Sequence, residues 1–165
     1  MFAQGWQTFS WIPNAYMEQA AAVYAATTES SEPVYGSPSV GRLDDRGENG
    51  MDLVGNIKKM YQRGDGHVHV LSTRIRSVNH LLCSFALGAE LATVPGKALE
   101  QWAAAGFPLP DSGGFSYKAI DAGGKPLKPI VYKELDLGRN WESFDIAHEL
   151  TTQEFANSCL IMKRH

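Results

Sequence analysis

Apolar and polar residues alternate in short segments along the first hundred residues, and this pattern predicts four β-strands. Residues 6–12 (WQTFSWI) alternate between aromatic and polar side chains, which is typical of a strand, and Pro13 and Asn14 are expected to end it. Three further short runs are interpreted as strands at residues 34–38, 68–72 and 91–94.

The segments between these strands have the composition or the apolar spacing of helices. Residues 51–61 place their apolar side chains at helical spacing, and Ser77 can cap a helix that ends before Gly88. The predicted helices cover residues 15–26, 51–61, 77–87 and 97–104. Strands and helices that alternate in this way predict a parallel sheet with right-handed crossovers.

The rest of the chain divides into three kinds of segment. Residues 41–50 are expected to form a charged, glycine-containing loop after the second strand. Residues 105–143 are rich in Pro, Gly, Lys and Asp and are expected to be irregular, and residues 144–165 are expected to form a C-terminal helix. With residues 1–104 as a half (β/α) barrel, the whole is expected to be one domain.

Length and charge narrow the possible functions. A complete eight-unit barrel takes about 250 residues, so 165 residues with four β/α units predict a partial TIM barrel of the α/β class. A net charge of −3 argues against binding to nucleic acid or to a membrane surface. The sequence has no run that approaches a membrane span and no signal-peptide pattern, so the expected compartment is the cytoplasm.

Two features of the predicted fold concern association and thiol chemistry. Four β/α units leave two open sheet edges and an uncovered inner face, so the chain is expected to form a homo-oligomer. The two cysteines, Cys83 and Cys159, have no CxxC spacing, and Cys83 is interpreted as a buried thiol on an apolar helix face.

The predicted strands open into polar loops that carry arginine. Arg42 follows the second strand and Arg76 follows the third. A guanidinium donates bidentate hydrogen bonds to phosphate oxygens, so this position suits a phosphate group. Simple rim charges are the alternative interpretation of both residues.

Four runs of the sequence resemble the second half of a small transaldolase, the group that includes fructose-6-phosphate aldolase. They are residues 37–45 (SPSVGRLDD), 50–54, 70–76 and 88–101, and residues 127–137 and 144–151 resemble the C-terminal end of one branch of the family. The resemblance implies a (β/α)8 barrel whose last four units lie in this chain. It also implies a sugar-phosphate substrate, with cleavage or transfer of a dihydroxyacetone unit through a lysine Schiff base, in carbohydrate metabolism of the pentose phosphate type.

Carried over residue by residue, the resemblance implies a phosphate site at the barrel mouth. Arg42 matches the phosphate-binding arginine of the family's Ser-Pro-Phe-Val-Gly-Arg run, and Ser37 matches the serine that opens it. Arg76 matches a second basic position that contacts the phosphate.

Three positions depart from the family's pattern. Arg74 stands where a small serine is usual, and Ser39 replaces the phenylalanine. The family has a threonine near the end of the first of these strands to hold the catalytic water, and Ser10 is the nearest candidate here. These changes favour divergence over simple truncation.

The resemblance places the Schiff-base lysine on a strand that precedes this chain, so the catalytic residue is unknown and the chain alone is expected to be inactive. Lys97 is interpreted as the start of a surface helix, and Lys58 and Lys59 as solvated helix residues. No cofactor is expected. One alternative is a non-catalytic half-barrel that oligomerises and binds a phosphorylated ligand, and another is an active site rebuilt across a dimer.

Other polar clusters are given structural interpretations, and no metal site is expected. Asp44 and Asp45 are interpreted as a solvated loop or as partners of Arg42 and Arg46. His67 and His69 alternate on one strand face but lack further ligands. The pair at 148–149 (HE) is interpreted as a helix start, and the glycine pairs at 113–114 and 123–124 as turns.

Overall fold

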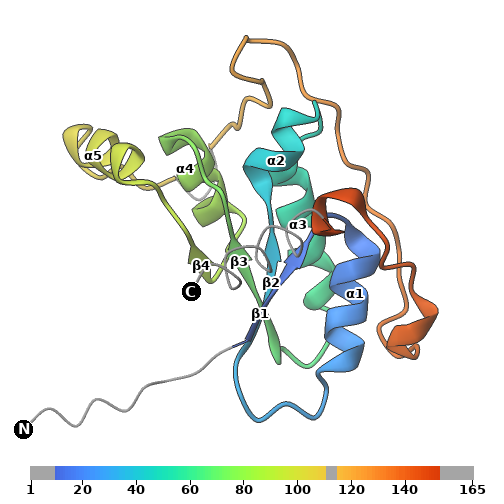
Figure 1. Cartoon of the computed structure of the whole chain (residues 1–165). Coiled ribbons are helices and arrows are strands. Elements are labelled where there is room, and N and C mark those ends of the chain that lie inside the picture. Colours follow the sequence, from blue (N-terminus) through green and yellow to red (C-terminus); the bar gives the residue numbers. More distant parts are fainter. Residues whose placement is uncertain (1–9, 111–114, 153–165) are drawn as a thin grey trace, which may run out of the picture.

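The computed structural model describes residues 10–110 and 115–152, and its centre is a four-stranded parallel sheet (Figure 1). The strands follow the chain in the order β1-β2-β3-β4. They are β1 (Ser10–Asn14), β2 (Val34–Pro38), β3 (Val68–Ser72) and β4 (Leu91–Ala92). Four parallel strands that alternate with helices are the arrangement expected of part of a β/α barrel.

The four predicted helices connect the strands as the sequence predicts. The predicted helices correspond to α1 (Met17–Ala26), α3 (Gly50–Tyr61), α4 (Val78–Ala86) and α5 (Gly96–Ala104). A 3₁₀ turn, η1 (Trp141–Ser143), follows the irregular segment. The cap predicted at Ser77 is confirmed, since Ser77 accepts the His80 N–H at the start of α4. Asn49, which was not predicted as a cap, accepts the Met51 N–H at the start of α3.

The expected charged loop after β2 is partly wrong, because its first half is a short helix, α2 (Val40–Asp45). Val40 and Leu43 are both fully buried, and the Leu43 N–H donates to the Ser39 carbonyl at 3.3 Å. The apolar pair lies three residues apart, so one helical turn buries both side chains against the core. Residues 46–49 then form the turn into α3.

Strand limits differ at both sides of the sheet. β1 continues through Pro13 and Asn14, because an edge strand tolerates a proline, and residues 6–9 of the predicted strand lie outside the described residues. β4 is two residues long instead of four. Main-chain bonds still join the β4 segment to β3, since the Glu90 N–H donates to the Val70 carbonyl at 3.1 Å and the Thr93 N–H to the Ser72 carbonyl at 2.9 Å. Side chains add to this ladder, because the Val70 N–H donates to Glu90 Oε2 at 2.7 Å and the Arg74 N–H to Thr93 Oγ1 at 3.3 Å.

The core lies between one face of the sheet and helices α1, α3 and α4. α3 supplies most of it, and its fully buried side chains include Met51, Leu53, Val54, Ile57 and Met60. From the sheet, Val34 and Val70 face this layer and are buried. Since successive strand residues point to opposite faces, the intervening residues Tyr35 and His69 lie on the other face.

That other face is only partly covered in the described structure. The rings of Tyr35 and His69 lie 5.4 Å apart, and both side chains are half-buried. Leu91 of β4, on the same face by register with Leu71, is 42% exposed. In a barrel this face would be the interior.

Residues 115–140, here called the strap, cross back over α2 and α3 (Figure 1). The Lys128 N–H donates to the Gly47 carbonyl, and the Asn49 N–H donates to the Lys128 carbonyl, both at 2.8 Å. Side chains of α3 bind the next part of the strap, since the Ile130 N–H donates to Asp52 Oδ2 and the Ile130 carbonyl accepts from Asn56 Nδ2. Apart from isolated bridges, the described part of the segment at 105–143 is irregular, as predicted, until η1.

The C-terminal helix begins later than predicted. Residues 144–148 are not helical, and helical structure covers residues 149–152, where the description ends. His148 accepts the Leu150 N–H at 3.2 Å, which confirms the pair at 148–149 as a helix start. Gly123 and Gly124 form a turn, as predicted, and residues 113–114 lie outside the described residues. Among the helices described, none is long and apolar enough to cross a membrane.

Candidate functional site

The site predicted from the sequence lies where β2 and β3 end. Ser37 Oγ is buried and donates to Thr73 Oγ1 at 3.2 Å, and Thr73 Oγ1 donates to the Pro38 carbonyl at 2.8 Å. The Val40 N–H in turn donates to the Thr73 carbonyl at 3.1 Å. These bonds join the loop after β2 to the loop after β3, so Ser37 has a structural partner in addition to its predicted phosphate role.

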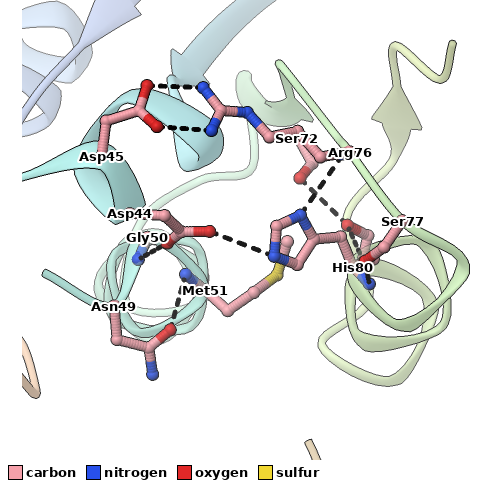
Figure 2. A network of polar contacts seen from close by, with 10 residues as sticks. Asp44, Asp45, Asn49, Gly50, Met51, Ser72, Arg76, Ser77 and His80 are labelled. Carbon is pink, nitrogen blue, oxygen red and sulfur yellow. Dashed lines mark hydrogen bonds and ion pairs between the residues drawn. The ribbon is translucent and has the colours of Figure 1, made fainter. Parts of the chain in front are cut away.

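Arg76 makes a bidentate pair with Asp45 (Figure 2). Its two terminal nitrogens donate to the two carboxylate oxygens, each at 2.5 Å. The guanidinium lies against the backbone of α2, because a Cβ added to Gly41 would lie 2.4 Å from Arg76 Nε. Hydrogen bonds from Arg76 lower the pKa of the Asp45 carboxyl below its usual range.

Arg42 lies on α2 one turn before Asp45. Its charge also contributes to the lowered pKa of Asp45, after the contributions of Arg76. Of the two arginines predicted to bind phosphate, Arg76 contacts Asp45 from the loop after β3, and Arg42 lies on the same short helix as Asp45. The phosphate roles of Arg42, Arg76 and Ser37 remain predictions.

Asp44 and His80 form a buried pair beside this cluster (Figure 2). His80 Nε2 lies 3.1 Å from Asp44 Oδ2, and the other oxygen, Oδ1, accepts the Gly50 N–H at 3.0 Å. His80 Nδ1 accepts the main-chain N–H of Arg76 at 3.3 Å. An imidazole nitrogen that accepts a hydrogen bond carries no proton, so the geometry selects the neutral Nε2–H form of His80.

The interpretation of the two aspartates as a solvated loop is therefore wrong. Asp44 is buried and pairs with His80, and Asp45 pairs with Arg76. Arg46, the other expected partner, contacts Glu149 Oε2 at 2.9 Å. Sequence analysis passed over His80 because its partner lies in a different β/α unit.

A polar cleft of about 500 Å³ opens beside these side chains. It is lined by Asp44, Asp45, Arg76, Ser77, His80 and residues 120–123 of the strap. The Tyr117 ring lies 5.9 Å from that of His80, and its buried hydroxyl has no hydrogen-bond partner among the described residues. Burial raises the pKa of this hydroxyl above its usual range.

Two of the altered positions, Arg74 and Ser10, lie in the loop that carries Arg76 and at the start of β1. Arg74 adopts φ of 56°, a left-handed conformation that is unfavourable for a side chain larger than glycine. Ser10 begins β1 and pairs in register with Val34, so it does not lie near the strand end as expected. The residue at that end is Asn14, whose buried amide has no hydrogen-bond partner within residues 10–110 and 115–152.

The other histidines and Cys83 have structural surroundings. His67 precedes β3 and its Nδ1 lies 2.5 Å from Asp65 Oδ1, while His69 packs on Tyr35. No group of three His, Cys, Asp or Glu residues in the described ranges could hold a metal ion. Cys83 is buried as predicted, and this burial raises the pKa of its thiol to about 12.

None of the four strands described carries a lysine. Lys97 begins α5, as predicted. The interpretation as a solvated side chain is confirmed for Lys59, which is exposed, with its Nζ 4.2 Å from the centre of the Tyr132 ring. It is wrong for Lys58, which is half-buried and forms an ion pair with Glu90.

Comparison with known proteins gives partial similarity to one family. No family model matches the chain. It is 40% identical over 77 residues to a probable transaldolase of Chelativorans sp. (strain BNC1), which is 47% of this chain and 35% of that protein. It is 39% identical over 93 residues to a probable transaldolase of Anaeromyxobacter sp. (strain Fw109-5), covering 56% and 42%.

A third relative gives the same result. A probable transaldolase of Bacteroides thetaiotaomicron is 43% identical over 79 residues, which is 48% of this chain and 35% of that protein. The matched segments thus span between 35% and 42% of the length of these curated relatives.

Proposed function

Since the chain belongs to the transaldolase family, we propose that its β2–α2 and β3–α4 connections form the phosphate-binding part of a sugar-phosphate site. The observation that carries the proposal is the position of Arg42 and Arg76 at the carboxyl ends of parallel strands, with Arg76 on Asp45 and Arg42 on the same helix as Asp45. Ligands of β/α barrels bind at this end of the strands. The guanidinium donors there match phosphate oxygens in geometry and charge.

The proposed reaction of the complete site is transfer or cleavage of a dihydroxyacetone unit from a ketose phosphate. A lysine amine attacks the ketose carbonyl, water leaves, and the protonated imine accepts the electron pair of the carbon–carbon bond that breaks. The part of this chain is to hold the phosphate so that the carbonyl lies at a fixed distance from that amine.

We propose that the chain alone does not perform this chemistry. The four described strands carry no lysine, and this supports the proposal because a Schiff-base lysine at a barrel mouth projects from a strand. The two lysines on α3 project from a helix and have other partners, because Lys58 is ion-paired with Glu90 and Lys59 lies over the Tyr132 ring.

Two measurements test the proposal. Titration calorimetry with fructose 6-phosphate and with unphosphorylated fructose should show binding of the phosphorylated sugar only, and Arg42→Ala should abolish it. Arg63→Ala is the matched control, because Arg63 follows the carboxyl end of α3, at the opposite end of the sheet, and pairs there with Glu134. Equal binding of both sugars would contradict the phosphate site.

Borohydride reduction in the presence of fructose 6-phosphate tests the catalytic half. We expect no lysine to gain the mass of the reduced sugar adduct. A stoichiometric adduct on one lysine would show that Schiff-base chemistry is present in this chain and would overturn the proposal of inactivity.

A second candidate function is a non-catalytic half-barrel that associates with another copy. The partly covered sheet face, with Leu91 42% exposed, favours it. Molar mass in solution, with near-ultraviolet circular dichroism on the same sample, tests it. A discrete oligomer with ordered aromatic signals would support this function, and an ordered monomer would argue against it.

A further inference from the structure

The segment that carries Arg76 belongs to no helix or strand. β3 ends at Ser72 and α4 begins at Val78, and within the intervening loop Arg74 has φ of 56°. Ile75 anchors the loop by burying its side chain. The direction in which the next residue, Arg76, leaves the backbone depends on whatever holds its own main-chain N–H.

His80 holds that N–H. Its Nδ1 accepts the Arg76 N–H at 3.3 Å from one turn into α4. The ring is itself fixed, because Nε2 lies 3.1 Å from Asp44 Oδ2, and the helix start is capped by Ser77 Oγ, which accepts the His80 N–H at 3.2 Å.

Asp44 is anchored independently of His80. Its Oδ1 accepts the Gly50 N–H at 3.0 Å, at the first residue of α3. The next residue, Asp45, accepts both terminal nitrogens of Arg76. The guanidinium of Arg76 is thus bound directly by Asp45, and its main-chain N–H is bound by the His80 imidazole, which contacts Asp44 (Figure 2).

We propose that His80 is a positioning residue. In its Nε2–H form it contacts Asp44 through Nε2 and the main-chain N–H of Arg76 through Nδ1, and it thereby fixes the direction of the Arg76 guanidinium. The direction of the guanidinium affects ligand binding only if Arg76 binds phosphate, and in that respect the inference rests on the proposed function. The ring position also depends on the other groups that face it, which are Tyr117 and Asp121 of the strap.

Two substitutions test the contact made by Nδ1 separately from the contact made by Nε2. The amide oxygen of His80→Asn lies close to the position of Nδ1 and retains an acceptor for the Arg76 N–H. The longer His80→Gln places its amide nitrogen near Nε2, where it retains the donor to Asp44 and loses that acceptor. A neutral hydrogen bond is worth about 1 kcal/mol, so we expect His80→Gln to bind inorganic phosphate about five-fold more weakly.

His80→Asn should bind phosphate within about two-fold of the unaltered chain. Ser84→Ala is the control for helix damage, because Ser84 lies one turn after His80 on α4 and contacts neither ring nitrogen. Its Oγ makes a buried bond to Ser72 Oγ at 3.0 Å and donates to the His80 carbonyl at 2.9 Å. It should lower stability without altering affinity. Equal affinities of the Asn and Gln variants, measured on their folded fractions, would overturn the proposal.

Nitrogen NMR of the ring gives a readout that does not depend on phosphate. In the unaltered chain, Nδ1 of His80 should have the acceptor-type shift, which is the nitrogen chemical shift of a ring nitrogen that carries no proton. Asp44→Asn keeps the acceptor for Gly50 and turns its amide NH₂ toward Nε2, so the acceptor-type shift should move to Nε2 and the Arg76 amide should exchange faster. An unchanged ring and an unchanged Arg76 amide would overturn the inference.

The outcomes distinguish the two proposals. If the unaltered chain does not bind phosphate but the ring changes form in Asp44→Asn, the positioning role stands and the phosphate function fails. If phosphate binds and His80→Gln binds it equally well, the phosphate function stands and the positioning role fails. If His80→Gln does not fold, the Asp44→Asn spectrum decides.

Discussion

The imidazole Nε2 of His80 lies 3.1 Å from Oδ2 of Asp44, and each side chain is only 9% exposed. The neighbouring pair, Asp45 and Arg76, is a bidentate ion pair whose side chains are 57% and 49% exposed. Two adjacent aspartates on one short helix therefore hold the same loop, one from inside the protein and one from its surface. The buried contact is expected to contribute more to stability, because water screens the exposed ion pair.

Asp44→Asn should destabilise the protein more than Asp45→Asn. The buried substitution places an NH₂ group against the donor of His80, and we expect a loss of about 1–3 kcal/mol in the free energy of unfolding. The exposed pair is worth less than about 1 kcal/mol. Urea denaturation measures both, and a lower midpoint at an unchanged slope is the expected signature. Equal midpoints for the two variants would contradict this account.

Gly41→Ala should separate Arg76 from α2. Its Cβ would lie 2.4 Å from Arg76 Nε and 2.7 Å from the Arg74 carbonyl oxygen, and a backbone atom cannot move aside as easily as a side chain. Overpacking of this kind costs about 1–3 kcal/mol. Gly96→Ala is the matched control at the start of α5, because its Cβ would meet nothing within 4 Å. Thermal unfolding of the two variants tests the difference.

The pKa of Asp45 should rise to its ordinary range in Arg76→Gln. Arg76 lowers it in the folded chain, so the stability that the pair contributes is present above the unfolded value of about 3.9 and is lost as the pH falls through the lower folded value. A carboxyl ¹³C titration measures this directly. Arg63→Gln should leave the Asp45 titration unchanged.

Phosphate and Asp45 should compete for Arg76. The carboxylate occupies both terminal nitrogens, and the backbone of α2 lies against Nε, so a bidentate ligand must displace Asp45. Asp45→Asn removes this competition and should tighten phosphate binding. The gain in affinity should be at most about five-fold, because the exposed Asp45–Arg76 pair is worth less than about 1 kcal/mol. Glu142→Gln removes the same charge from η1 and should have little effect. Weaker binding in Asp45→Asn would contradict the competition.

The Cys83 thiol should be unreactive in the folded protein. Burial raises its pKa to about 12, so almost no thiolate is present at pH 8. Iodoacetamide should label it only after denaturation, in a Cys159→Ser background that removes the second thiol. Because the folded pKa is raised, stability should fall as the pH rises from about 8.5 toward that value. Rapid labelling of the native protein would contradict the burial.

Local patterns predicted much of the fold. The strands at 34–38 and 68–72 are found at those limits, and the predicted cap at Ser77 forms because the start of α4 supplies its own N–H donors nearby. Helix α2 was missed because its charged residues obscure a buried pair, Val40 and Leu43.

The site was harder to predict because its contacts join separate β/α units. Arg42 and Arg76 were singled out from strand-end position and family resemblance, and the structure pairs Arg76 with Asp45, on the helix that carries Arg42. No local pattern indicates that Asp44 meets His80, since the two lie on different helices. Asn14 was taken for a turn residue because proline precedes it, although it ends β1.

The strap has a consequence for synthesis of the chain. Strand order follows chain order, so each strand can pair with a neighbour that has already left the ribosome. The Asn49 N–H is different, because its partner, the Lys128 carbonyl, is translated much later. A nascent chain that ends after α5 could assemble the sheet, but the joint between α2 and α3 would close only when the strap arrives.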